Sequence, residues 1–118
     1  MSIKVEIKGL EELKSSFKKS PELVKKYIGE AINKSILTIQ AKAVPFTPKD
    51  TGFLKGSFSA SFGTLRGSLE NTAPYAGYVH DGTKFMKGRP YLEQGTRAAE
   101  SAIQSFFDSA MDKIAKEL

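Results

Sequence analysis

The opening of the chain alternates between apolar and polar residues. Ile3, Val5 and Ile7 fall on one side of an extended segment, and charged residues fall between them. This period of two predicts a β-strand with one buried and one solvent-facing side, ending at Gly9. The next apolar residues recur at helical spacing and predict a short amphipathic helix under the strand. They are Leu10, Leu13 and Phe17.

The pattern then changes to one continuous helical stripe. Ser20 suits the N-cap of this helix, and Pro21 suits its first position, where the missing N–H costs nothing. Pro45 and Pro48 are expected to end the helix near Val44. The residues predicted to be buried along it are Val24, Ile28, Ala31, Ile32, Ser35, Ile36, Ile39 and Ala43.

The middle of the chain is rich in glycine and predicts short elements. Segments 57–63 and 66–73 alternate with period two across a turn, so we expect a β-hairpin. Phe58, Ala60 and Phe62 should share one face, and Leu69 of the second strand is expected to join them. Segment 74–82 predicts a short helix with Pro74 in its first turn and Gly82 closing it. Segment 83–89 predicts a basic loop.

A last long helix is predicted from Pro90 to near Leu118. Its apolar stripe comprises Ala99, Ile103, Phe106, Phe107, Ala110, Met111, Ile114 and Leu118. Two long helices with a few short strands predict a single α+β domain spanning residues 1–118. In this fold class, a small antiparallel sheet, made of the N-terminal strand and the central hairpin, packs with the two long helices and short connecting helices.

Composition limits the function classes. The chain has 118 residues, 40% hydrophobic and 26% charged, which is typical of one globular domain. It contains no cysteine, so disulfide frameworks and cysteine metal sites are excluded. No window approaches the roughly 18 apolar residues of a membrane helix. The N-terminus lacks the apolar run of a secretory signal, so we expect synthesis in the cytoplasm and no membrane partner.

The tripeptide Asp50-Thr51-Gly52 admits two interpretations. In aspartic proteases two such copies pair, and their carboxylates share a proton. There the tripeptide follows an apolar strand, whereas here it follows "FTPK", and two long helices leave too few strands for a protease barrel. We therefore expect a capped turn in which Asp50 accepts backbone N–H bonds and Gly52 adopts an unusual backbone angle. Leu54 and Phe58 should then enter the core.

Other enzyme signals are weak. The single histidine, His80, is followed by Asp81, and adjacent side chains point apart in most backbones. We interpret His80 as a hydrogen-bonded packing residue. No serine has the context of a nucleophile elbow, and no glycine motif of the phosphate-binding type occurs. We expect no enzyme activity and no catalytic, cofactor-binding or metal site.

Three segments occur in a fixed order: "PKDTGFLKGSF" after the long helix, "APYAGYVHDGT" after the hairpin, and "GRPYLEQG" at the last helix. In this order they resemble the head–tail joining, or tail-completion, proteins of long-tailed bacteriophages over nearly the whole chain. The sequence departs from that pattern at His80-Asp81, where an acidic-plus-aromatic pair is common, and at Tyr91, where Phe is usual. The matching residues are Pro48, Asp50, Thr51, Gly52, Leu54, Ser57, Pro74, Tyr75, Ala76, Tyr78, Val79, Gly82, Thr83, Pro90, Tyr91 and Leu92.

The resemblance implies a structural virion protein in the phage neck. It implies a homo-oligomeric ring, expected to be hexameric, around a channel through which genomic DNA passes without specific binding. The implied partners are the head-completion or stopper protein on one side and the tail terminator or tail-tube protein on the other. Within the second segment, we expect Tyr75, Tyr78 and Val79 to anchor the short helix to the sheet and long helices.

The basic loop is the candidate subunit interface, because it carries apolar residues between cations. The alternative is a loop folded back on its own sheet. The candidate interface residues are Lys84, Phe85, Met86, Lys87 and Arg89.

A second function remains open. The net charge of +5 is compatible with a small basic nucleic-acid-binding protein. Such a protein needs clustered arginines and aromatic platforms. This chain has only Arg66, Arg89 and Arg97, and its aromatic residues fall mainly on the predicted core stripes.

Overall fold

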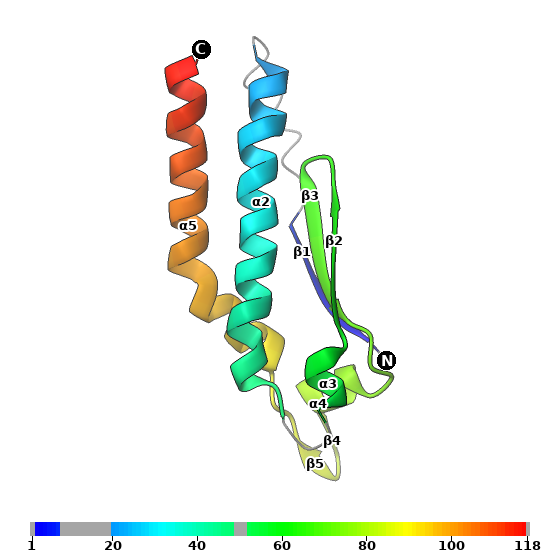
Figure 1. Ribbon diagram of the computed structural model, residues 1–118. Coiled ribbons are helices and arrows are strands. Elements are labelled where there is room, and N and C mark those ends of the chain that lie inside the picture. Colours follow the sequence, from blue (N-terminus) through cyan, green and yellow to red (C-terminus); the bar gives the residue numbers. More distant parts are fainter. Residues whose placement is uncertain (1, 8–19, 49–51, 118) are drawn as a thin grey trace.

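The computed structural model describes residues 2–7, 20–48 and 52–117. The predicted short helix with Leu10, Leu13 and Phe17 lies outside the described residues, as do Asp50 and Thr51. The described part is a rod of 55 × 22 × 22 Å. As Figure 1 shows, the C-terminus lies at one end of the rod and α3 and α4 lie at the other.

The sheet has three antiparallel strands, β1 (Ile3–Ile7), β2 (Phe58–Gly63) and β3 (Arg66–Asn71). Their order is β1-β3-β2, so the second hairpin strand occupies the centre. The register places Val5 and Ala60 on either side of Leu69, which is fully buried. The sequence prediction that the N-terminal strand and the hairpin form one sheet is confirmed.

Helix α2 (Pro21–Ala43) packs along this sheet. Its buried residues are the eight predicted from the helical stripe. Gly67 of β3 allows the close approach, because a Cβ there would lie 2.9 Å from Ile36 and 3.0 Å from Ile32. Ser20 is the N-cap residue, but its side chain makes no capping hydrogen bond, contrary to expectation. The helix continues into one 3₁₀ turn, η1 (Val44–Phe46).

Helix α5 (Tyr91–Glu117) runs antiparallel to α2 and makes the most extensive contact in the fold. The helices approach closely where Gly95 meets Ala43, since a Cβ on Gly95 would lie 2.6 Å from the Ala43 Cα. Ala99, Ala110 and Ile114 are buried as predicted. The other described members of the predicted stripe pack half-buried against the core; they are Ile103, Phe106, Phe107 and Met111.

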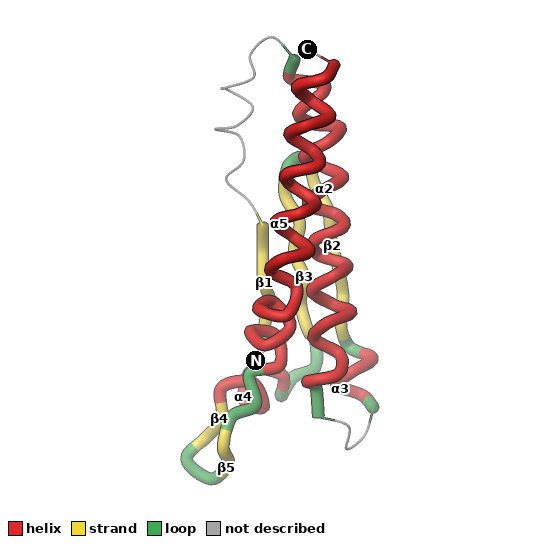
Figure 2. The backbone as a smooth tube through the Cα atoms, turned by 90° about the vertical axis from the view of Figure 1, so that its left-hand side faces the viewer, coloured by secondary structure: helices red, strands yellow, loops and turns green. Residues whose placement is uncertain are grey.

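The result is a layered α+β domain. Figures 1 and 2 show α2 between α5 and the sheet, and most of the buried apolar side chains belong to these layers. No helix in the described ranges is both long enough and apolar enough to cross a bilayer. Three short elements, α3 (Phe53–Gly56), α4 (Ala76–Asp81) and the strand pair β4 (Gly82–Thr83) and β5 (Met86–Lys87), gather at one end of the rod.

Candidate interface at one end of the molecule

The described residues of the three sequence segments that carry the resemblance converge at this end, although Pro48 and Leu92 are 44 positions apart in the chain. We call the unit made by α3, α4, the β4–β5 hairpin and the start of α5 the motif end. Asn71, fully buried, donates from Nδ2 to the Leu54 carbonyl (2.7 Å) and accepts from the Ala73 N–H (3.1 Å). It therefore ties α3 to the segment that leads into α4.

Tyr91 ties α5 to α4. Its ring is fully buried, and its hydroxyl donates to the Ala76 carbonyl at 3.0 Å. The ring meets Phe58 and His80 edge-on, at centroid distances of 6.1 and 5.2 Å. Burial, with smaller contributions from Asp81 and Tyr75, raises the pKa of Tyr91 to about 12. Tyr91 is thus a neutral hydrogen-bonded packing residue.

His80 occupies the same junction. Its Nδ1 lies 2.9 Å from the Asp81 carboxylate, and its Nε2 accepts from the Glu93 N–H at 3.4 Å. The neutral tautomer protonated at Nδ1 satisfies both contacts. The expectation that the two adjacent side chains point apart is wrong, because both lie at the C-terminal end of α4, where the backbone turns. The interpretation of His80 as a hydrogen-bonded packing residue is confirmed.

The first segment forms a turn around Gly52. Gly52 has φ +73°, in the left-handed region that glycine tolerates, and its carbonyl accepts from the Gly56 N–H at 3.0 Å. The predicted role of Asp50 in capping falls outside the described residues. Leu54 is buried and Phe58 packs against the core, as predicted. Ser57 donates to the Phe53 carbonyl at 2.6 Å, which closes the short helix.

Several aromatic side chains of the motif end face solvent instead of the core. Tyr78 is 52% exposed and Tyr75 39%, so the prediction that these tyrosines anchor α4 is wrong. Val79 does pack against the core, as predicted. On α4 the core-facing positions are Ala76, Gly77 and Val79. Tyr75 instead lies beside the exposed Phe53, with ring centroids 6.1 Å apart.

The predicted basic loop is a tight β-hairpin. Thr83 pairs with Met86 and Gly82 with Lys87. A Cβ on Gly82, whose φ is +86°, would lie 2.5 Å from the Gly88 backbone nitrogen, so the base of the hairpin needs a glycine there. The sequence predicts Gly82 as the end of a helix, but its contact with Gly88 exists only because the hairpin folds back.

The hairpin presents its apolar residues outward. Phe85 is 87% exposed and Met86 47%, and the Lys84 ammonium lies 5.1 Å from the centroid of the Phe85 ring. The alternative of a segment folded back on its own sheet is therefore wrong for Phe85. Figure 2 shows the hairpin projecting from the end of the rod.

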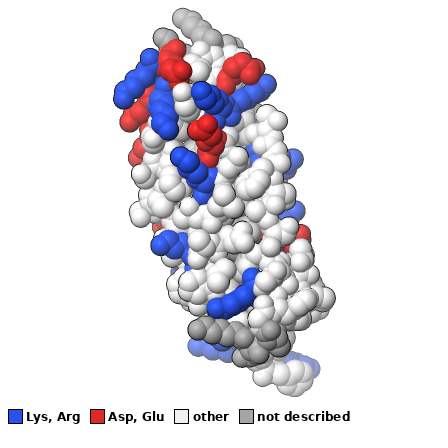
Figure 3. Space-filling model, in the orientation of Figure 1, with Lys and Arg blue, Asp and Glu red and all other residues white. Residues whose placement is uncertain are grey.

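Charge is unevenly distributed along the rod. Residues 52–57, residues 74–90 and the first turn of α5 carry four cations, Lys55, Lys84, Lys87 and Arg89, and two carboxylates, Asp81 and Glu93. At the opposite end, Figure 3 shows acidic and basic side chains interspersed. The motif end therefore exposes more large apolar side chains than the opposite end, and its charge is predominantly basic.

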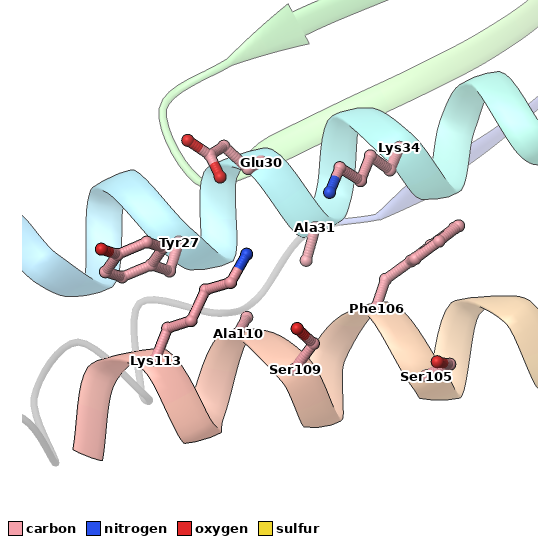
Figure 4. Close-up of a pocket in the computed structure, with 9 residues that line it drawn as sticks. All are labelled: Tyr27, Glu30, Ala31, Lys34, Ser105, Phe106, Ser109, Ala110 and Lys113. Carbon is pink, nitrogen blue, oxygen red and sulfur yellow. The ribbon is translucent and has the colours of Figure 1, made fainter. Parts of the chain in front are cut away.

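A cavity also lies between α2 and α5, toward the far end of the rod (Figure 4). Its volume of about 160 Å³ is below the roughly 300 Å³ at which small-molecule sites begin. Its lysines lie over aromatic rings, Lys113 over Tyr27 and Lys34 over Phe106. The Tyr27 hydroxyl donates to the Glu117 carboxylate, which raises the pKa of Tyr27. Within the described ranges, His and acidic residues form no cluster that could hold a metal ion.

Comparison of the chain with protein-family models, curated proteins and solved structures finds no match.

Proposed function

We propose that this chain is a structural assembly protein of a bacteriophage neck. In this proposal, copies of the chain form a ring that joins head to tail and leaves a channel for the genome. The head-completion or stopper protein and the tail terminator or tail-tube protein are the neighbours. The protein acts in the virion, by binding and not by catalysis.

The observation that carries the proposal is the composition of the motif end. The segments that resemble head–tail joining proteins fold into one unit, and this unit exposes Phe53, Tyr75, Tyr78, Phe85 and Met86. Single exposed apolar residues are common, but a group of five at one end of a small rod is typical of a binding surface.

The motif end is also firmly attached, which an assembly contact requires. Besides the Asn71 and Tyr91 hydrogen bonds, the Arg89 N–H donates to the Val79 carbonyl at 2.9 Å and closes the hairpin onto α4. A contact held on a rigid base loses less conformational entropy when it docks. The cations beside Phe85 favour approach to an acidic neighbour, and burial of Phe85 and Met86 supplies affinity.

Deletion of the gene in the phage or prophage that encodes this chain tests the proposal. We expect separate heads and tails by electron microscopy, joined particles after complementation with the wild-type gene, and the chain in purified particles by mass spectrometry. Normally joined particles from the deletion strain would contradict the proposal. Particles that join only with the gene but never contain the chain would assign it a transient role in assembly instead.

The basic motif end also gives the alternative function, nucleic-acid binding, a specific test. Two of the three arginines already face carboxylates: Arg97 contacts Glu93 at 2.6 Å, and Arg66 lies 3.9 Å from Glu6. Both arginine side chains are more than half exposed, so these ion pairs compete only weakly with phosphates for the guanidinium groups. A salt-sensitive electrophoretic shift with duplex DNA would favour this alternative, whereas no shift at low salt would exclude it.

A further inference from the structure

Strand β2 forms an edge of the sheet, and none of the described segments pairs with its outer side. Natural proteins protect such edges with charged residues, proline or bulges, because an open strand is a template for another strand. β2 reads Phe58-Ser59-Ala60-Ser61-Phe62-Gly63 and contains none of these protections. The opposite edge strand, β1, carries Lys4 and Glu6.

The hydrogen-bonding pattern identifies which groups of β2 are available. The Thr72 N–H donates to the Ser57 carbonyl at 3.0 Å, and the register places these residues opposite each other. Hydrogen-bonded pairs alternate along an antiparallel ladder. Ser59 and Ser61 therefore direct their backbone groups toward β3, and the residues between and beside them direct theirs outward. The outward-facing residues are Phe58, Ala60 and Phe62.

The five residues from Phe58 to Phe62 form a palindrome, FSASF. When two copies pair antiparallel about an axis through Ala60, Ala60 faces its own copy and Phe58 faces Phe62. In each of these pairs the backbone N–H and C=O groups of both residues point away from β3. They can therefore hydrogen-bond to each other across the two β2 strands. Serine meets serine on the solvent face. The segment is therefore complementary to itself in hydrogen bonding, in side-chain face and in chemistry.

We propose that the free protein forms a two-fold dimer through β2, and that the occupant of this edge is a second copy of the chain. Phe62 is 47% exposed in the single chain, although it lies on the same face as the core residue Phe58. In the dimer it gains an aromatic cross-strand neighbour. A groove lined by Phe62, Gly29 and Asn33 opens between β2 and α2 and borders the same contact.

The helices do not obstruct this arrangement. The two-fold axis stands perpendicular to the sheet, so both copies of α2 lie on the same face. Helix α2 packs mainly over β3, and the two β3 strands are three strand spacings apart, about 14 Å. This separation exceeds the roughly 10 Å between packed helices. The contact closes on itself, so it differs from the repeating contact of a ring, and the inference stands independently of the proposed function.

Mass measurement by light scattering is the first test. At about 100 μM, a concentration at which weak dimers form, we expect twice the chain mass of 12.9 kDa, falling toward the single mass on dilution. A single-chain mass at every concentration would overturn the proposal.

Ser61→Lys and Ser68→Lys form a matched pair of variants. The two serines lie opposite each other with their hydroxyls 3.0 Å apart, so each substitution removes the same hydrogen bond. Only the ammonium introduced at position 61 would approach its symmetry mate across the axis, where like charges repel. We expect Ser61→Lys to raise the dimer dissociation constant about ten-fold or more and Ser68→Lys about two-fold or less. Equal effects, or a larger assembly that Ser61→Lys leaves intact, would overturn the proposal.

A cross-link locates the axis. Because the chain has no cysteine, Ala60→Cys introduces one thiol per copy, and paired thiols at the axis would lie within about 6 Å of each other. A short bis-maleimide should join two Ala60→Cys chains, whereas Ser68→Cys chains should stay separate, because their Cα atoms would lie about 14 Å apart across the sheet and about 7 Å apart along the strands. Equal cross-linking of both variants, or of neither, would show that the axis does not pass through Ala60. Head–tail complementation by Ser61→Lys then tests the ring separately.

Discussion

Tyr91→Phe tests how the motif end is held together. The substitution keeps the ring and removes the hydroxyl that donates to the Ala76 carbonyl inside the protein. A buried carbonyl that loses its partner costs roughly 1–2 kcal/mol. We therefore expect the free energy of unfolding at pH 8 to fall by about that amount, measured by urea denaturation.

The pH dependence gives this prediction a sharper form. Burial raises the pKa of Tyr91 from 10 to about 12, so the folded chain keeps its proton where the unfolded chain has lost it. The stabilisation is complete below pH 10 and is lost as the pH rises from 10 to 12. At about 1.4 kcal/mol per pH unit, the whole loss is roughly 2–3 kcal/mol. The advantage of wild type over Tyr91→Phe should therefore shrink to near zero by about pH 11.

Urea denaturation of both proteins at about pH 8, 9.5 and 11 measures this difference, and the lysines, which titrate in both, cancel. Tyr78→Phe is the control at pH 8, because its half-exposed hydroxyl should contribute less than about 0.5 kcal/mol. A wild-type advantage that stays constant from pH 8 to 11 would refute the reasoning, as would ultraviolet absorbance that shows Tyr91 ionising near pH 10.

Three further outcomes are expected. Substitution of both Phe85 and Met86 by Ser should change the free energy of unfolding by less than about 0.5 kcal/mol, since both side chains are exposed, but heads and tails should fail to join in complementation. An unfolded variant, or normal joining, would contradict this. Gly82→Ala should lower the free energy of unfolding by about 1–3 kcal/mol, measured by thermal unfolding, because of the positive φ of Gly82 and its contact with Gly88. Gly29→Ala is the control: Gly29 has open space around it, so the substitution should stabilise α2 by up to about 1 kcal/mol, and similar effects from both variants would refute the strain argument. Asn71→Ala should lower the free energy of unfolding by roughly 2–3 kcal/mol in urea denaturation, because the Leu54 carbonyl and the Ala73 N–H lose their partner. A change near zero would show that water replaces the amide.

The sequence by itself determined the elements whose pattern is local. The helical stripe on α2 requires only that every third or fourth residue be apolar, so all eight buried positions could be predicted. The alternation in β1 and β2 likewise predicted the strands, and Gly52 and Gly82 marked positions with positive φ. The α+β class followed from the order of these elements.

Tertiary structure alone decided which aromatic residues are buried. Tyr75, Tyr78 and Tyr91 look equivalent in the sequence, but of the three only Tyr91 is buried. It is the first residue of α5, and its ring lies between α4 and Phe58 of the sheet. The side-chain pairing of His80 with Asp81 also required the backbone turn at the end of α4. These outcomes depend on where separate elements meet, and periodicity within one element carries no information about that.

The candidate surfaces divide in the same way. The sequence identified Phe85 and Met86 as interface candidates because cations flank them, but the fold added Phe53, Tyr75 and Tyr78 from segments that are distant in the chain. The FSASF palindrome is visible in the sequence. Its outward-facing backbone groups are not, because they depend on the register against β3, and a register is a relation between two strands that only the folded chain fixes.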